Sequence, residues 1–131
     1  MSDSASVYWA DLAEDMQDPE FLRQFVLESI RISTVDSIVN TIDEAREAAG
    51  LSKAGLARAI SAEPAVVRRL LGRASRSNPT LGTLSELAAA LGYRVTLEPV
   101  KASAALVAQA LRTGSAVDAS ELARAVSELA A

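Results

Sequence analysis

Residues 51–72 have the sequence LSKAGLARAISAEPAVVRRLLG, in which two short helical patterns follow one another. Ser52 is a good N-cap, because its hydroxyl can accept hydrogen bonds from the first free N–H groups of a helix expected over 53–60. Pro64 is typical of a first helical position and predicts a second helix that ends near Gly72. This stretch therefore predicts two helices separated by a short turn.

The apolar positions of the stretch fit a packed helix pair. Two helices joined by so short a turn, here 61–63, are typical of a helix-turn-helix, whose second helix lies in the major groove of DNA. Ala57 is small where the helices must approach closely, and Ile60 is apolar where they bury their inner side. On a helical wheel, the inner stripe of the second helix consists of Val67, Leu70, Leu71 and Ala74.

The opposite side of the second helix predicts the DNA contacts. Ala65 and Gly72 are small there, so that the helix can lie close to the bases, and Arg69 shares their side. The forked donors of arginine match a guanine edge, and we expect Arg69 to contact a base. Arg68 and Arg73 point sideways, where phosphates run, and are expected to contact them.

Two more basic residues extend this predicted surface. Lys53 and the first N–H groups of its helix are expected to hold a phosphate. Arg76 lies in the loop 73–80 and is expected to meet the DNA backbone or a groove. An exposed arginine is usually ordinary solvated surface, and Arg58 is interpreted in that way. The prediction of DNA binding therefore depends on the helix pair, the small residues and the local charge together.

The charges are segregated along the chain, although the net charge is only −4. Residues 1–45 hold ten acidic and two basic residues, a net charge of −8. Residues 46–76 hold seven basic and two acidic residues, a net charge of +5. The basic block coincides with the helix pair, and a polyanion responds to local potential rather than to the average.

The composition favours an all-α protein and argues against catalysis. Apolar residues make up 50% of the 131 positions but aromatic residues only 4%, so the core must consist mainly of helix-forming Leu and Ala with Val and Ile. The chain has no cysteine and no histidine, which removes the commonest metal ligands and the commonest general base. We expect no enzyme active site, no metal and no cofactor. No apolar run approaches the ~20 residues of a membrane span, and a soluble, cytoplasmic protein is expected.

Further elements are expected on both sides of the helix pair. Asp18 and Pro19 predict a helix start, and a separate helix is expected over 35–49, followed by Gly50. After the pair, a fifth helix is expected over 81–91. A short strand over 93–98 follows, with unpaired edges that would join either its copy in a second subunit or a strand of a partner protein.

These elements divide the chain into three expected parts. Residues 1–34 form an acidic N-terminal extension with a helix, and residues 35–98 form the helix-turn-helix domain that ends in the strand. Residues 99–131 form a C-terminal helical hairpin joined at Gly114, which is expected to serve dimerisation. Asp118 and Glu121 have the spacing of a capping box at the start of its last helix.

From Ile42 to Leu97 the chain resembles the lambda-repressor-like helix-turn-helix family, also called the xenobiotic-response-element family. The segments REAAGLSKAGLARAI, PAVVRRLLG and NPTLGTLSELAAALG follow the order and spacing of that family. The resemblance implies a five-helix domain that binds a double-stranded DNA operator as a homodimer. The resemblance places the base-reading positions on Pro64, Ala65 and Arg69 and a phosphate position on Lys53. The chain departs from the family at Ser61, which occupies a turn position that is often glycine.

Within that family the chain is most similar to HigA-type antitoxins, because DPEF at 18–21 precedes the domain and YRVTLEP at 93–99 follows it. This similarity implies an antitoxin that represses its own operon and neutralises a RelE/HigB-like ribonuclease toxin. Such toxins are typically basic, so the acidic segment with Trp9, Phe21 and Phe25 is expected to dock on one.

Two alternatives stay open for these assignments. The aromatic residues of the N-terminal segment fit a role in covering the core equally well. The alternative function is a stand-alone helix-turn-helix repressor that dimerises through its C-terminal helices and has no toxin partner.

Overall fold

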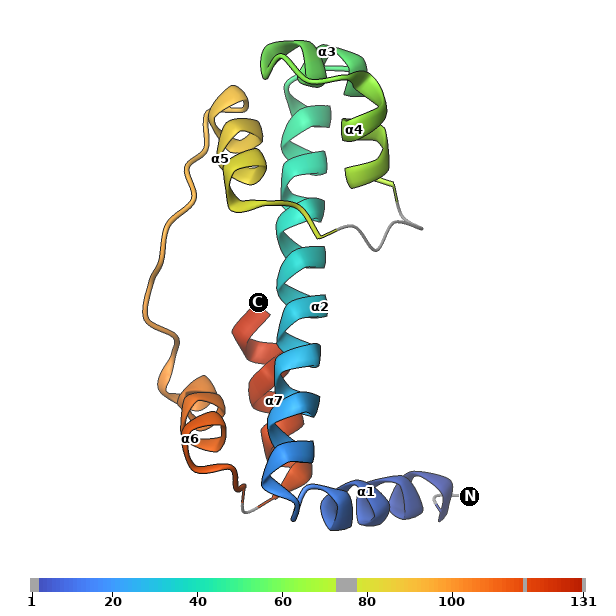
Figure 1. Ribbon diagram of the computed structural model, residues 1–131, viewed down its shortest axis with the longest axis vertical. Coiled ribbons are helices and arrows are strands. Elements are labelled where there is room, and N and C mark those ends of the chain that lie inside the picture. Colours follow the sequence, from blue (N-terminus) through green and yellow to red (C-terminus); the bar gives the residue numbers. More distant parts are fainter. Residues whose placement is uncertain (1–2, 73–77, 117, 131) are drawn as a thin grey trace. The chain divides into compact units, whose positions relative to one another are not determined.

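The computed structural model describes residues 3–72, 78–116 and 118–130, and the regular elements in these ranges are all helical (Figure 1). This confirms the predicted all-α class. None of the described helices combines the length and the apolar character that crossing a membrane requires. In chain order the elements are α1 (Asp3–Asp15), α2 (Pro19–Ala48), α3 (Lys53–Ala59), α4 (Pro64–Leu70), α5 (Leu81–Ala90), the 3-10 turn η1 (Ala102–Ala104), α6 (Ala105–Thr113) and α7 (Ala119–Ala130).

The chain forms two compact units. The terminal unit consists of residues 1–34 and 99–131, and the central unit consists of residues 35–98. The two ends of the chain, which were expected as separate parts, therefore pack into one unit. Helix α2 contributes its first part to the terminal unit and the remainder to the central unit.

The boundary between the two units falls between residues 34 and 35, where it was expected, but the two separate helices expected on either side of it are wrong, because α2 runs without interruption from Pro19 to Ala48. No glycine and no further proline lies inside this range, so nothing in the backbone stops the helix. The predicted start is confirmed: the Asp18 carboxylate accepts a hydrogen bond from the Glu20 N–H at 3.0 Å. One 30-residue helix therefore replaces the two that the sequence predicts.

The terminal unit has its own apolar core. Leu22 and Val26 of α2 are fully buried there, and Arg23 Nε donates to the carbonyl oxygen of Leu111 at 3.0 Å, which ties α2 to α6. The apolar faces of α6 and α7 are thus used inside the chain. The buried residues are Leu12, Met16, Leu22, Val26, Val107, Ala110, Ala119, Leu122, Ala125 and Val126.

The central unit is built around the predicted helix pair. Leu56 and Ala57 of α3 are fully buried, as the small-residue pattern predicts, and α2 contributes Ile42 to the same core. Helix α5 completes the same cluster with Leu84 and Leu87. The buried residues are Ile42, Leu56, Ala57, Val67, Leu70, Leu71, Leu84 and Leu87.

The strand expected over 93–98 is wrong for the described part of the chain, where these residues have no regular structure and are all exposed. Helix α5 ends at Ala90, and Gly92, two residues later, has a φ of +82°, the left-handed conformation that glycine adopts without strain. A strand needs a neighbouring strand to complete its hydrogen bonds, and the described residues of this chain supply none.

Candidate nucleic-acid interface

Helices α3 and α4 lie against each other at one end of the central unit (Figure 1). The four residues 60–63 join them, within the range of turn lengths found in helix-turn-helix motifs. Ser52 caps α3 as predicted, because its hydroxyl accepts a hydrogen bond from the Gly55 N–H at 2.9 Å. The two helices pack against each other through buried residues of one apolar cluster, which includes Leu56, Ala57, Val67 and Leu70.

Burial along α4 separates an inner side from an outer side. Val67, Leu70 and Leu71 are at most 6% exposed, so the predicted inner stripe is confirmed at these positions. Arg68 and Arg69 are both exposed, and so is Ala65. The outer side of α4 therefore presents two guanidinium groups beside a small residue.

Val66 also belongs to this outer side, and the sequence reasoning missed it. It is 41% exposed, and it lies three residues before Arg69, a spacing that makes the two side chains neighbours on a helix surface. The sequence carried a signal for this position, because on a helical wheel Val66 falls outside the buried stripe of Val67, Leu70 and Leu71. The outer face of α4, hereafter the α4 face, consists of Ala65, Val66, Arg68 and Arg69.

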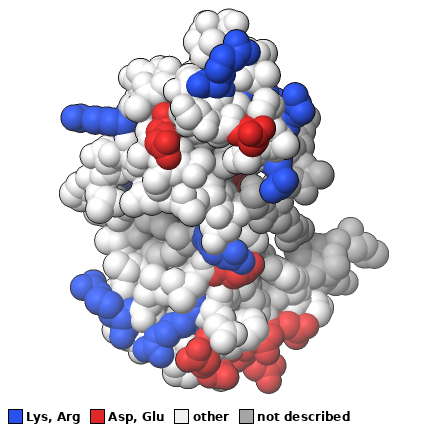
Figure 2. Space-filling view, turned by 45° about the horizontal axis from the view of Figure 1, so that its top comes forward, with Lys and Arg blue, Asp and Glu red and all other residues white. Residues whose placement is uncertain are grey.

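The charges on the α4 face are not neutralised within the described part of the chain. The ion pairs found there join Arg31 to Glu28 and Arg46 to Asp43 and Glu47, and neither Arg68 nor Arg69 takes part in one. Figure 2 shows basic side chains projecting at several separate places next to acidic ones. Among the described residues, Arg68 and Arg69 of α4 are therefore exposed cations without an acidic partner.

The remaining predicted DNA-binding residues have a mixed outcome. Lys53 and Pro64 are both half-buried at the first positions of α3 and α4. Helix α4 ends at Leu70, two residues before the predicted end near Gly72, and Gly72 is half-buried. Arg73 and Arg76 lie outside the described residues.

The predicted partner-binding aromatic residues all lie in the terminal unit. Trp9 on α1 and Phe21 on α2 are each 37% exposed, whereas Phe25 is half-buried and packs against the core. Phe21 and Phe25 stack with ring centroids 6.4 Å apart, and Trp9 meets Tyr8 edge-on at 5.2 Å. Of the three, Phe25 therefore serves the core, while Trp9 and Phe21 present ring surface to solvent.

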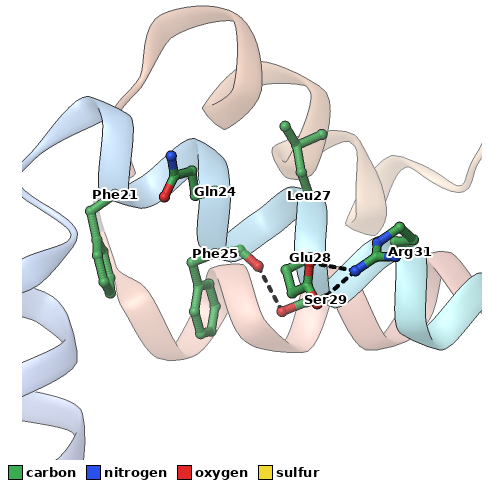
Figure 3. A pocket seen from close by; sticks show the side chains of 7 residues that line it. All are labelled: Phe21, Gln24, Phe25, Leu27, Glu28, Ser29 and Arg31. Atoms are coloured by element: carbon green, nitrogen blue, oxygen red, sulfur yellow. Dashed lines mark hydrogen bonds and ion pairs between the residues drawn. The ribbon is translucent and has the colours of Figure 1, made fainter. Parts of the chain in front are cut away.

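Phe21 and Phe25 also line a surface hollow on α2, in which their rings project in the same direction (Figure 3). Arg31 closes the hollow at its other end and is held by Glu28 at 2.9 Å. The hollow is apolar at the aromatic end and charged at the other, but it is open and belongs to a single helix. The lining residues are Phe21, Gln24, Phe25, Leu27, Glu28, Ser29 and Arg31.

Comparisons of the chain with protein-family models, with curated proteins and with solved structures give no match.

Proposed function

We propose that this chain is a sequence-specific DNA-binding repressor of the helix-turn-helix type, with α4 as its recognition helix. The α4 face carries the proposal: Arg68 and Arg69 are exposed and free of ion pairs in the described residues, while the opposite side of the same helix is buried. Because neither arginine forms an ion pair with another described residue, binding to DNA breaks no such ion pair within the chain.

The side chains of the α4 face can contact polar base edges, thymine methyl groups and phosphates of DNA. Arg69 presents two parallel donors to a guanine edge, while Ala65 and Val66 provide apolar contact for a thymine methyl group. Arg68 lies beside this ridge and is the phosphate contact. We expect base reading to depend chiefly on Arg69, since the other outward residues at the start of α4 have no polar side chain.

A salt titration of duplex binding tests this division of roles. Fluorescence anisotropy on a labelled duplex should show affinity that falls steeply with salt, and Arg68→Ala should reduce the slope of log K against log[salt] by about 1. Arg112→Ala removes an exposed arginine of the terminal unit and is the matched control. A slope that Arg112→Ala lowers and Arg68→Ala does not would contradict the assignment.

We further propose that the repressor is an antitoxin that neutralises a basic RelE/HigB-like ribonuclease toxin and regulates the operon that encodes both. The supporting observation is the exposed aromatic surface of Trp9 and Phe21 in a segment of net charge −8. Aromatic anchors within an oppositely charged surface are typical of protein interfaces.

Co-expression tests the antitoxin role directly. A small basic reading frame next to this gene should arrest growth when expressed alone, and co-expression of the chain should restore growth. The double variant Trp9→Ala/Phe21→Ala should lose this rescue, while Leu81→Ala, which removes an exposed apolar side chain of the central unit, should keep it. Absence of any toxic neighbour would favour the alternative, a stand-alone repressor that dimerises through its C-terminal helices.

A further inference from the structure

The segment Tyr93–Glu98, YRVTLE, has the pattern of a strand but no strand partner in the described chain. Its side chains are all exposed, and Leu97 is 99% exposed. Tyr93 donates its N–H to the Ala88 carbonyl at 2.7 Å as part of the α5 end, and among the described residues no backbone hydrogen bond joins 94–98 to another part of the chain. Both edges of this extended segment are therefore available for pairing.

The residues of this segment alternate between two faces. In an extended chain Tyr93, Val95 and Leu97 share one face, and Arg94, Thr96 and Glu98 share the other. The segment is thus apolar on one side and carries opposite charges at the two ends of the other. This arrangement is complementary to itself when the direction of the second strand is reversed.

We propose that the segment pairs in antiparallel fashion with the same segment of a second copy of this chain, with the two Thr96 residues opposite each other. In this register Arg94 of one copy faces Glu98 of the other, twice by symmetry. Val95 faces Leu97 on the apolar side, also twice. Every cross-strand pair between positions 94 and 98 then joins side chains of matching character.

In other arrangements of two copies, the charged and apolar side chains do not face matching partners in this way. A parallel in-register pair sets Arg94 against Arg94 and Glu98 against Glu98, and like charges directly opposite are destabilising. Shifting the antiparallel register by one residue places apolar side chains opposite polar ones. Centring the antiparallel pair on Val95 or on Leu97 keeps the apolar side chains on one face of the ribbon, but Arg94 then no longer lies opposite Glu98. The charges therefore select one register.

The pair needs its apolar side as well as its backbone hydrogen bonds. A two-stranded ribbon alone is marginal in water, so burial of Leu97 and Tyr93 between the copies is part of the interface. The buried apolar side chains of α6 and α7 already belong to the core of the terminal unit, so they do not form the contact between two copies. The proposal does not depend on DNA binding and is tested without DNA.

A charge exchange tests the pairing and its register. Analytical ultracentrifugation should show a dimer for the native chain, and Arg94→Glu or Glu98→Arg should each weaken it roughly tenfold, since each creates two like-charge contacts. The double variant Arg94→Glu/Glu98→Arg should restore dimerisation. Arg58→Glu, at an exposed site on α3, makes the same change in net charge as Arg94→Glu and should have no effect. A double variant as weak as the single ones would overturn the register.

Disulfide trapping provides an independent readout, because the chain has no cysteine of its own. Thr96→Cys places two thiols directly opposite, within the range of a disulfide, and should be cross-linked to a dimer by a mild oxidant. Val95→Cys faces Leu97 and not its own copy, and should cross-link far less. A native chain that stays monomeric, and a Thr96→Cys variant that does not cross-link faster than Val95→Cys, would overturn the proposal and favour a strand of another protein as the partner.

Discussion

Arg46 Nη1 donates to the carbonyl oxygen of Leu51 at 2.7 Å, across the end of α2 and the turn that leads into α3. The same side chain is only 12% exposed and pairs through Nε with Asp43 at 2.9 Å. Arg46 belongs to the basic block of the sequence, but its charge is used to fix the start of the helix-turn-helix. It is therefore not among the cations available to DNA.

Replacing Arg46 should destabilise the central unit. Arg46→Ala leaves the Leu51 carbonyl without its donor and should lower the free energy of unfolding by about 1–3 kcal/mol. Arg31→Ala removes an arginine with the same i,i+3 geometry from an exposed pair, and should cost less than about 0.5 kcal/mol. Urea denaturation of both variants checks this, and equal losses would contradict the structural role of Arg46.

Ser61 has a φ of +56°, a left-handed conformation that costs a residue with a Cβ atom. It occupies the same position at the end of α3 as Gly50 at the end of α2: the N–H of the residue that follows each bonds to the carbonyl of the fifth residue back. Ser61→Gly should raise the free energy of unfolding by about 0.5–1 kcal/mol, while Ser61→Ala should not. A destabilised Ser61→Gly variant would show that the serine hydroxyl contributes a contact of its own.

Gly114 and Gly50 have nearly equal φ values, +76° and +73°, but different surroundings. A Cβ at Gly114 would lie 2.8 Å from Pro19 Cβ and 3.0 Å from Arg23 Nη2, whereas a Cβ at Gly50 would meet nothing within 4 Å. Gly50→Ala should therefore cost about 1 kcal/mol from backbone strain alone. Gly114→Ala should cost about 2–4 kcal/mol because overpacking is added. Equal losses in denaturation experiments would contradict the close packing of α2 against the end of α6.

Asp118 should make stability sensitive to acid. Its carboxylate accepts hydrogen bonds from the Ser120 hydroxyl at 2.7 Å and from the Ser120 N–H at 2.8 Å, which lower the pKa of Asp118 below its usual 3.8. A lowered pKa in the folded state stabilises the fold above the unfolded-state pKa, and this contribution is lost as pH falls through the folded-state value.

Melting temperatures of the native chain and Asp118→Ala should therefore differ at pH 7 and converge below about pH 4. Asp118→Asn keeps an acceptor oxygen without a charge, and should recover part of the loss at pH 7 with less dependence on pH. A difference between the native chain and Asp118→Ala that stays constant from pH 7 to pH 3 would contradict the role of the ionised carboxylate.

Local signals in the sequence were enough for most helix ends. Ser52, Pro64 and Gly50 mark their helices correctly, because caps, first-position prolines and left-handed glycines act within a few residues. The inner stripe of α4 was predictable for the same reason. These features depend on the nearest turn of the chain and little else.

Features that depend on distant contacts were not predictable. Helix α1 was not expected, since Leu12 and Met16 give a weak pattern until α2 and α7 cover them. The strand over 93–98 was expected from alternation alone, although a strand forms only against a neighbour. The internal use of Arg46 also depends on packing that sequence periodicity does not contain.

The central claim is that the α4 face reads DNA sequence through Arg69. Binding-site selection from a random duplex library tests it most directly, with the native chain and Arg69→Ala selected in parallel and Arg58→Ala as the exposed-arginine control. The native chain and Arg58→Ala should enrich the same two-fold symmetric motif, with half-sites about 10 base pairs apart and a guanine that Arg69→Ala no longer selects. The same motif enriched by all three proteins, or no motif enriched by the native chain, would contradict the account.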